Sequence, residues 1–149
     1  MHIENALNTQ NRVLLENQTN LELSQEAFEI VLRIVIESEV LDSESFVNLL
    51  LSNDGSIRTF NKKYLGRDEL TDVISFEADM PGVHLLGDII IDTSVADKQK
   101  ENRTLIEELQ ELFLHGLLHL LGYDHLSAAR ETIMSDKEKK YSLLLKENS

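Results

Sequence analysis

The chain has 149 residues, of which 42% are hydrophobic, so it can bury one core and we expect a single domain over residues 1–149. It contains no cysteine, which excludes a disulfide framework and a thiolate metal site. Its formal net charge of -13 argues against non-specific electrostatic binding of nucleic acid. DNA is therefore not an expected partner, and any RNA contact would need a local basic patch.

The sequence carries no sign of a membrane or export segment. No apolar run approaches the roughly 18 residues of a membrane span. Residues 1–12 lack the basic region followed by an apolar stretch that marks a secretory signal. We therefore expect a soluble, cytoplasmic protein that makes no membrane contact. Residues 1–10 are polar without a clear period, and we interpret them as a flexible tail.

Two elements are predicted in the first third of the chain. The short apolar run at residues 12–16 is interpreted as an edge strand. A helix follows Ser24, which is a favourable N-cap, and Glu26 places a carboxylate in its first turn. The apolar residues of this helix recur at spacings of three and four and form one stripe. They are Ala27, Phe28, Val31, Leu32, Val35 and Ile36.

The one clear basic cluster lies in and just after a short helix predicted at residues 56–65. A strand at residues 45–52 and a turn at residues 53–55 precede this helix. The cluster comprises Arg58, Lys62, Lys63 and Arg67. A run of this kind is often only a solvated helix face, but its position before the next strand also favours phosphate binding. Both interpretations stay open at this point.

Two strands are predicted next, at residues 71–76 and 85–92, and the second is apolar enough to be central. A loop with Pro81 and Gly82 is expected to join them as a hairpin. His84 falls in this loop, and we interpret it as an exposed loop residue, with substrate contact as the minor alternative.

Helices are predicted to fill the last third of the chain. A short polar helix is expected at residues 93–102, and Thr104 with Glu107 predicts a capping box for the next helix. The later half of that helix is apolar nearly all round, which indicates a buried central helix. A last helix begins at Ser127. The order of elements predicts an α/β (α+β) fold, with one small mixed sheet of about four strands covered mainly by helices.

The segment HGLLHLLGYDH, which ends the central helix, holds three of the five histidines. His115 and His119 are four residues apart, so their side chains share one helix face. Gly122 can take a left-handed conformation that ends the helix, which lets His125 return to the same point. Three imidazoles around one ion, with a fourth position open to water, are the arrangement of a catalytic zinc site. Unrelated core or surface histidines are the alternative, which the third histidine and the glycine disfavour.

The spacing of these histidines is also that of the metzincin proteases. Those enzymes carry a glutamate directly after the first histidine as general base, whereas this chain has Gly116. The pattern therefore predicts a hydrolytic metal site without the base of the protease. A metallopeptidase built on this spacing remains one alternative.

The segment HGLLHLLGYDH, preceded by TDVISF and LGDIIID, resembles the YbeY family of bacterial endoribonucleases. The resemblance extends from about Asn61 to His125. It implies a metal-dependent enzyme that cleaves single-stranded RNA in ribosomal RNA maturation and ribosome quality control. It also implies one divalent ion per chain, usually zinc, held by His115, His119 and His125. Its expected partners are a ribosomal RNA precursor and the ribosomal subunit.

The chain departs from the family pattern in the segment expected to hold substrate phosphate. The family has an arginine directly before a glycine, but here Leu65 precedes Gly66 and the nearest arginine is Arg67. The family also tends to have a proline where this chain has Leu70. Either Arg67 or Lys63 substitutes for the missing arginine, or the catalytic rate is altered.

The resemblance and the chemistry together give a set of candidate roles. Catalytic roles are assigned to His115, Arg67 and Asp124, and substrate binding to Arg58, Lys62, Lys63 and Arg67. The general base stays open between Asp124, Asp88 and the metal hydroxide itself. Asp124 also fits an acceptor that orients a histidine ring, or a turn residue. A ribosome-associated factor without catalysis, in which the metal only staples the fold, is a further alternative.

Overall fold

A computed structural model of the chain describes residues 12–65, 72–78 and 83–148. It contains a four-stranded sheet in the order β1-β2-β4-β3. The strands are β1 (Val13–Asn17), β2 (Phe46–Ser52), β3 (Val73–Glu77) and β4 (Leu85–Asp92). β2 is parallel to both β1 and β4, whereas β3 pairs antiparallel with β4. The predicted α/β fold with a small mixed sheet is confirmed, as are the edge position of β1 and the central position of β4.

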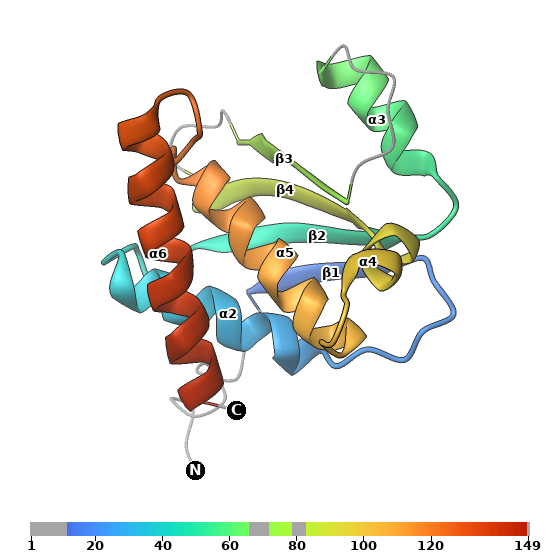
Figure 1. Cartoon of the computed structure of the whole chain (residues 1–149), viewed down its shortest axis with the longest axis horizontal. Coiled ribbons are helices and arrows are strands. Elements are labelled where there is room, and N and C mark those ends of the chain that lie inside the picture. The colour runs from blue at the N-terminus through green and yellow to red at the C-terminus, as the bar shows by residue number, and fades with distance from the viewer. Residues whose placement is uncertain (1–11, 66–71, 79–82, 149) are drawn as a thin grey trace.

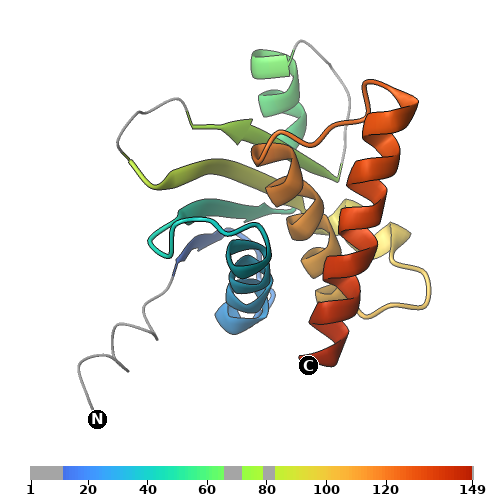
Figure 2. The ribbon, with the colours of Figure 1, turned by 90° about the vertical axis from the view of Figure 1, so that its left-hand side faces the viewer.

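Five helices accompany the sheet in the part of the chain that the structure describes. They are α2 (Gln25–Ser38), α3 (Ser56–Leu65), α4 (Thr93–Gln99), α5 (Leu105–Leu120) and α6 (Ala128–Glu147). Figure 1 shows α2, α5 and α6 gathered over one face of the sheet, and Figure 2 shows the same layer from the side. None of the described helices combines the length and apolar character needed to cross a membrane.

The two faces of the sheet carry different cores because neighbouring strand residues point to opposite sides. Ile89 and Ile91 belong to the main core beneath α2, α5 and α6. Ile74 and Ile90 pack instead with Ile57 of α3 in a second, smaller cluster. α3 therefore covers part of the opposite face.

The predicted N-caps of α5 and α6 form hydrogen bonds in the structure, whereas that of α2 does not. Thr104 and Glu107 form the predicted capping box of α5, and the Ser127 hydroxyl accepts a bond at the start of α6. Ser24 occupies the N-cap position of α2, but its side chain makes no capping hydrogen bond. α4 is shorter than predicted, and it is capped by the carboxylate of Asp92.

α5 runs antiparallel to β4, and two glycines let it approach the strand closely. A Cβ atom on Gly116 would lie 3.1 Å from the side chain of Ile89. A Cβ atom on Gly87 would lie 2.7 Å from Leu120 and 2.2 Å from the carbonyl oxygen of Phe76. The last turn of α5 is thereby placed over the beginning of β4, at the edge of the sheet that β3 completes.

Candidate metal centre

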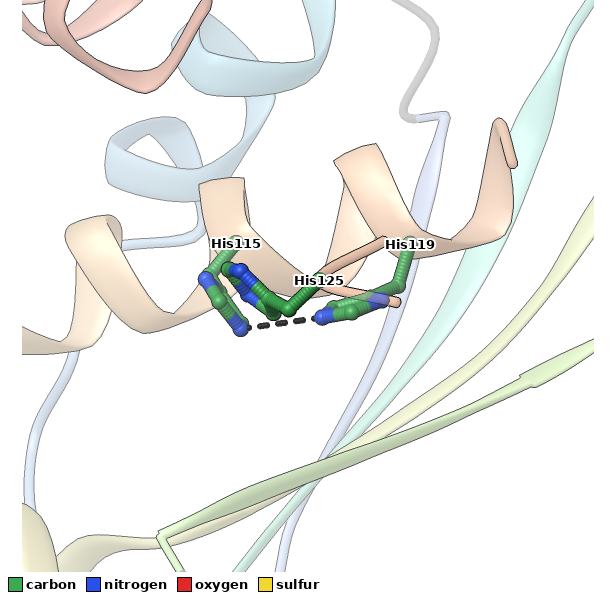
Figure 3. A group of neighbouring side chains, drawn as sticks. All are labelled: His115, His119 and His125. Carbon is green, nitrogen blue, oxygen red and sulfur yellow. Dashed lines mark hydrogen bonds between the residues drawn. The ribbon is translucent and has the colours of Figure 1, made fainter. Parts of the chain in front are cut away.

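His115 and His119 lie one turn apart on α5 and point to the same side of the helix, as Figure 3 shows. Their Nε2 atoms are 3.1 Å apart. Two nitrogens bound at about 2.1 Å to one tetrahedral zinc ion lie roughly 3.4 Å apart. The two rings therefore need only a small movement to share one ion.

His125 joins this pair because the chain reverses after α5. Gly122 has the predicted left-handed conformation, with φ of +98°, and the amide of Tyr123 donates to the carbonyl of Leu118 at 3.1 Å. This is the Schellman pattern of a helix end. The ring centroid of His125 lies 5.6 Å and 5.5 Å from those of the two helix histidines.

The three rings meet the requirements of a metal site. One ligand nitrogen from each of His115, His119 and His125 lies within 4.8 Å of the others. The first two side chains are half-buried and the third is exposed, so the group opens to solvent on one side. Three imidazoles with an open fourth position fit a catalytic zinc site better than a closed structural one.

His115 has an acceptor that fixes the orientation of its ring. The Nδ1 atom of His115 is 2.7 Å from Oε1 of Glu138 on α6. A proton held on Nδ1 of His115 leaves the lone pair of its Nε2 free for a metal. Burial, together with His115 and His125, lowers the pKa of His119 below 6.5, which keeps its ring neutral at pH 7.

The turn that carries His125 is anchored by a polar cluster around Glu39, just after α2. Its carboxylate accepts hydrogen bonds from Tyr123 at 2.7 Å, from Lys137 at 3.0 Å, and from Tyr141. Burial alone would raise the pKa of Glu39, but these three donors outweigh it and hold the pKa below 4.5. Burial and Glu39 raise the pKa of Tyr141 to about 12. The hydroxyl of Tyr123 therefore has a structural partner in the carboxylate of Glu39.

Removal of this anchor should destabilise the protein. We expect Glu39→Ala to lower the free energy of unfolding by about 2–3 kcal/mol, because it strands the hydroxyl of buried Tyr141. The ion pair of Glu39 with Lys137 adds little to this loss of stability, because the Lys137 side chain is 32% exposed. A carboxylate with a lowered pKa stabilises the fold above its unfolded pKa near 4.5, so the difference should shrink as pH falls below 4.5. Urea unfolding at pH 7 and pH 4 measures it, with exposed Glu37→Ala as the control. Equal losses in both variants would refute the role of Glu39.

The aspartates considered as general bases have other partners. The Asp124 carboxylate accepts from the amide of Leu126 at 3.0 Å and from Arg130 at 3.3 Å, as expected of a turn residue. Asp88 lies on the sheet face away from α5, where Asn48 donates to it at 2.8 Å. The sheet therefore separates Asp88 from the histidines.

The basic cluster is only partly described. Arg58, Lys62 and Lys63 are exposed on α3. Arg67, Gly66 and Leu70 lie outside the described residues, as do Pro81 and Gly82 of the predicted hairpin loop. α3 packs on the sheet face opposite α5, beside β3. An RNA strand held on α3 would have to cross the β3 edge of the sheet to reach the histidines.

His84 belongs to a second, exposed group of acidic and histidine side chains. Its ring nitrogens lie 3.7 Å from Asp42 and 3.3 Å from Glu44. All three side chains are exposed, so these contacts lie in solvent and contribute little to stability. This arrangement agrees with the interpretation of His84 as an exposed loop residue.

Gly116 occupies the position of the metzincin base, at a point where α5 packs tightly against the sheet. Gly116 is buried, and a Cβ atom at this position would lie 3.1 Å from the side chain of Ile89 on β4. A glutamate at this position would point into the core and away from the metal. The missing base is therefore a consequence of how closely α5 packs on the sheet.

Glu138 is the functional candidate that sequence reasoning missed. The buried stripe of α6 consists of Met134, Tyr141 and Leu145. Glu138 follows Met134 by four residues and precedes Tyr141 by three, so it falls on this apolar stripe. A charged residue at a core-facing helical position is the signal that could have identified it.

Comparisons with known proteins identify the relatives of the chain. The sequence model of the family described as "Endoribonuclease YbeY" matches residues 8–146. The "Endoribonuclease YbeY" of Syntrophotalea carbinolica is 41% identical over 133 residues, which cover 84% of this chain and 80% of that protein. The protein of the same name from Listeria monocytogenes is 33% identical over 144 residues, which cover 85% and 89%. The solution structure of TM1509 from Thermotoga maritima has a TM-score of 0.60 at 27% identity, and the match covers 89% of this chain and 88% of that one.

Proposed function

Since the chain belongs to the YbeY family and is by that membership an endoribonuclease, we propose that it cleaves single-stranded RNA with one divalent metal ion. The proposed ion is zinc, with His115, His119 and His125 as its ligands. The proposed substrate is a ribosomal RNA precursor, bound in the cytoplasm in association with a ribosomal subunit. Its proposed roles are ribosomal RNA maturation and ribosome quality control.

The observation that carries the proposal is the convergence of three histidines beside a solvent-open position. Two of their Nε2 atoms are only 3.1 Å apart, a hydrogen-bond distance that is also close to the separation of two nitrogen ligands on one zinc ion. Glu138 completes the arrangement because it adds a negative charge behind His115.

Different residues are proposed to bind the metal, contact the substrate phosphate and act as the base. A divalent ion at such a site acidifies a water molecule and polarises a phosphoryl oxygen. His115, His119 and His125 would hold that ion on the open side of α5. Arg67 is proposed to contact the substrate phosphate in place of the family arginine absent at Leu65. Asp124 is the proposed protein base beside His125, and its carboxylate also holds the turn.

α3 supplies features that suit single-stranded RNA. Proteins that bind single strands combine basic residues for phosphates with aromatic rings on which bases stack. Tyr64 is 55% exposed, and its ring stacks with that of Phe60 at 6.0 Å. The Nζ atom of Lys63 lies 5.2 Å from the centre of the Tyr64 ring. These side chains support binding of RNA along α3, from which the bound strand would cross the β3 edge of the sheet to reach the histidines.

Charge reversal in this basic segment should weaken RNA binding. We expect Arg67→Glu and Lys63→Glu each to lower affinity for a labelled single-stranded RNA at every sequence tested. Each should also flatten the log–log salt dependence by about 0.7, the value for one phosphate contact on a single strand. Arg67→Glu should have the larger effect because Arg67 replaces the family arginine.

Fluorescence anisotropy over a salt series measures both quantities. The control is Lys98→Glu, which reverses an exposed charge on α4. Metal content should stay unchanged in all three variants, since none alters a histidine. If the three variants bind RNA with the same affinity and slope as the wild type, the segment is only a solvated face.

The function itself is tested by removal and return of the metal. We expect a chelated preparation to lose cleavage of single-stranded RNA, to spare duplex RNA throughout, and to regain activity with one equivalent of zinc. Circular dichroism should change little on chelation, because the site has three ligands and an open position. Unfolding on chelation, with no cleavage at any metal concentration, would favour a non-catalytic ribosome-associated protein whose metal only stabilises the fold.

A further inference from the structure

We propose that Glu138 is a positioning residue that fixes the ring of His115 and thereby sets the affinity of the site for its metal. This inference rests on the proposed function in one respect, since it takes the three histidines as metal ligands. It assigns a role in the centre to α6, which contributes no histidine.

The contact between the two side chains is short and sheltered. Oε1 of Glu138 lies 2.7 Å from Nδ1 of His115, and the side chains are 32% and 30% exposed. Hydrogen bonds to ionised groups are shorter and stronger than neutral ones.

The position of Glu138 on α6 argues against an accidental ion pair. The residue lies on the stripe formed by Met134, Tyr141 and Leu145, all of which are buried. A carboxylate on such a stripe loses part of its hydration, which costs free energy unless a hydrogen-bond donor compensates for it. The ring of His115 is that donor. An apolar residue at position 138 would pack on the same stripe without this cost.

The geometry of the His115 ring also shows that Glu138 would position a ligand and would not contact the ion itself. In an imidazole the two nitrogens lie on different sides of the ring, so an acceptor at Nδ1 lies behind an ion bound at Nε2. The Nε2 atom of His115 is the one that meets His119 at 3.1 Å. Glu138 therefore acts through His115, by holding the proton on Nδ1 and by restricting rotation of the ring. Acceptors placed in this way typically change metal affinity by about 10–100-fold.

The experiment measures zinc affinity by competition with a chromophoric chelator. We expect Glu138→Ala to weaken zinc binding by about 10–100-fold, and Glu138→Gln to weaken it less, because its amide oxygen still accepts the bond. The control is Asp136→Asn, which removes one exposed carboxylate from the same helix and should leave affinity unchanged. The absorption spectrum of bound cobalt should shift in the alanine variant, because the ring of His115 is freed.

Each outcome decides the proposal. Unchanged zinc affinity and cobalt spectrum in Glu138→Ala would overturn it, even if that variant were less stable, because a purely structural ion pair affects only stability. If the alanine variant does not fold, Glu138→Met replaces it, because methionine packs on the apolar stripe but offers no carboxylate acceptor to His115; wild-type affinity and an unchanged spectrum in that variant would overturn the proposal. A wild-type protein that binds no zinc or cobalt would overturn the metal centre as well. Wild-type binding with an unaffected Glu138→Ala variant would overturn the positioning role alone.

Discussion

His119→Ala is expected to remove the metal and reduce RNA cleavage by on the order of 1,000-fold or more. The substitution leaves two ligands of three, and an ion held by two imidazoles is bound weakly. Without the ion, the pKa of water returns from about 7 toward 15.7, so little hydroxide is available at neutral pH. The fold should persist, because alanine favours helices and His119 is only half-buried on α5. Metal analysis and cleavage of a labelled single-stranded RNA measure the two effects.

The chain offers a matched control for this variant. His84 lies in the second group of potential ligands that the described residues contain, with Asp42 and Glu44. We expect His84→Ala to retain full metal content and full cleavage. If His84→Ala lost the metal and His119→Ala kept it, the centre would be in the wrong place. If His119→Ala lost the metal but cleaved RNA normally, the ion would be structural.

The features that were predictable from the sequence depend on neighbours along the chain. The spacing of His115 and His119 fixes their common helix face, and Gly122 has no Cβ to oppose a left-handed turn. The capping box of Thr104 and Glu107 likewise involves residues three positions apart. These relations are set by local geometry along the chain, so the shared face of the two helix histidines and the end of α5 could be inferred before any tertiary structure was known.

The features that were missed depend on packing between distant segments. The contact of Glu138 with His115 joins residues 23 positions apart, on two different helices. The bond of Tyr123 to Glu39 spans 84 positions. Asp88 was a plausible base until the strand order placed it on the face opposite α5. Sequence periodicity identifies which residues of an element share a face, but not which other element that face will meet.

Gly116 shows how packing decides chemistry at this centre. The histidine spacing is shared with metzincin proteases, in which a glutamate follows the first histidine. In this chain α5 lies so close to β4 that a Cβ at position 116 would touch two side-chain atoms of Ile89 at 3.1 Å. The base of a peptidase thus has no place here, which argues against that alternative on steric grounds.

Introduction of the protease residue should therefore unfold the protein rather than create a peptidase. We expect Gly116→Glu to cost about 4 kcal/mol or more, because it places an unpaired carboxylate between α5 and the buried Ile89. In a domain of this size, that corresponds to a melting temperature lower by roughly 8–16 °C, or to no folded protein at all. Gly116→Ala should change stability by only about 1 kcal/mol, since the helix propensity of alanine offsets the crowding. Ala129→Glu, which adds the same charge at an exposed position of α6, should have little effect. Thermal unfolding and a zinc-loaded peptide-library assay measure the outcome, and a stable Gly116→Glu variant that cleaves peptides would show that the site is a latent metallopeptidase.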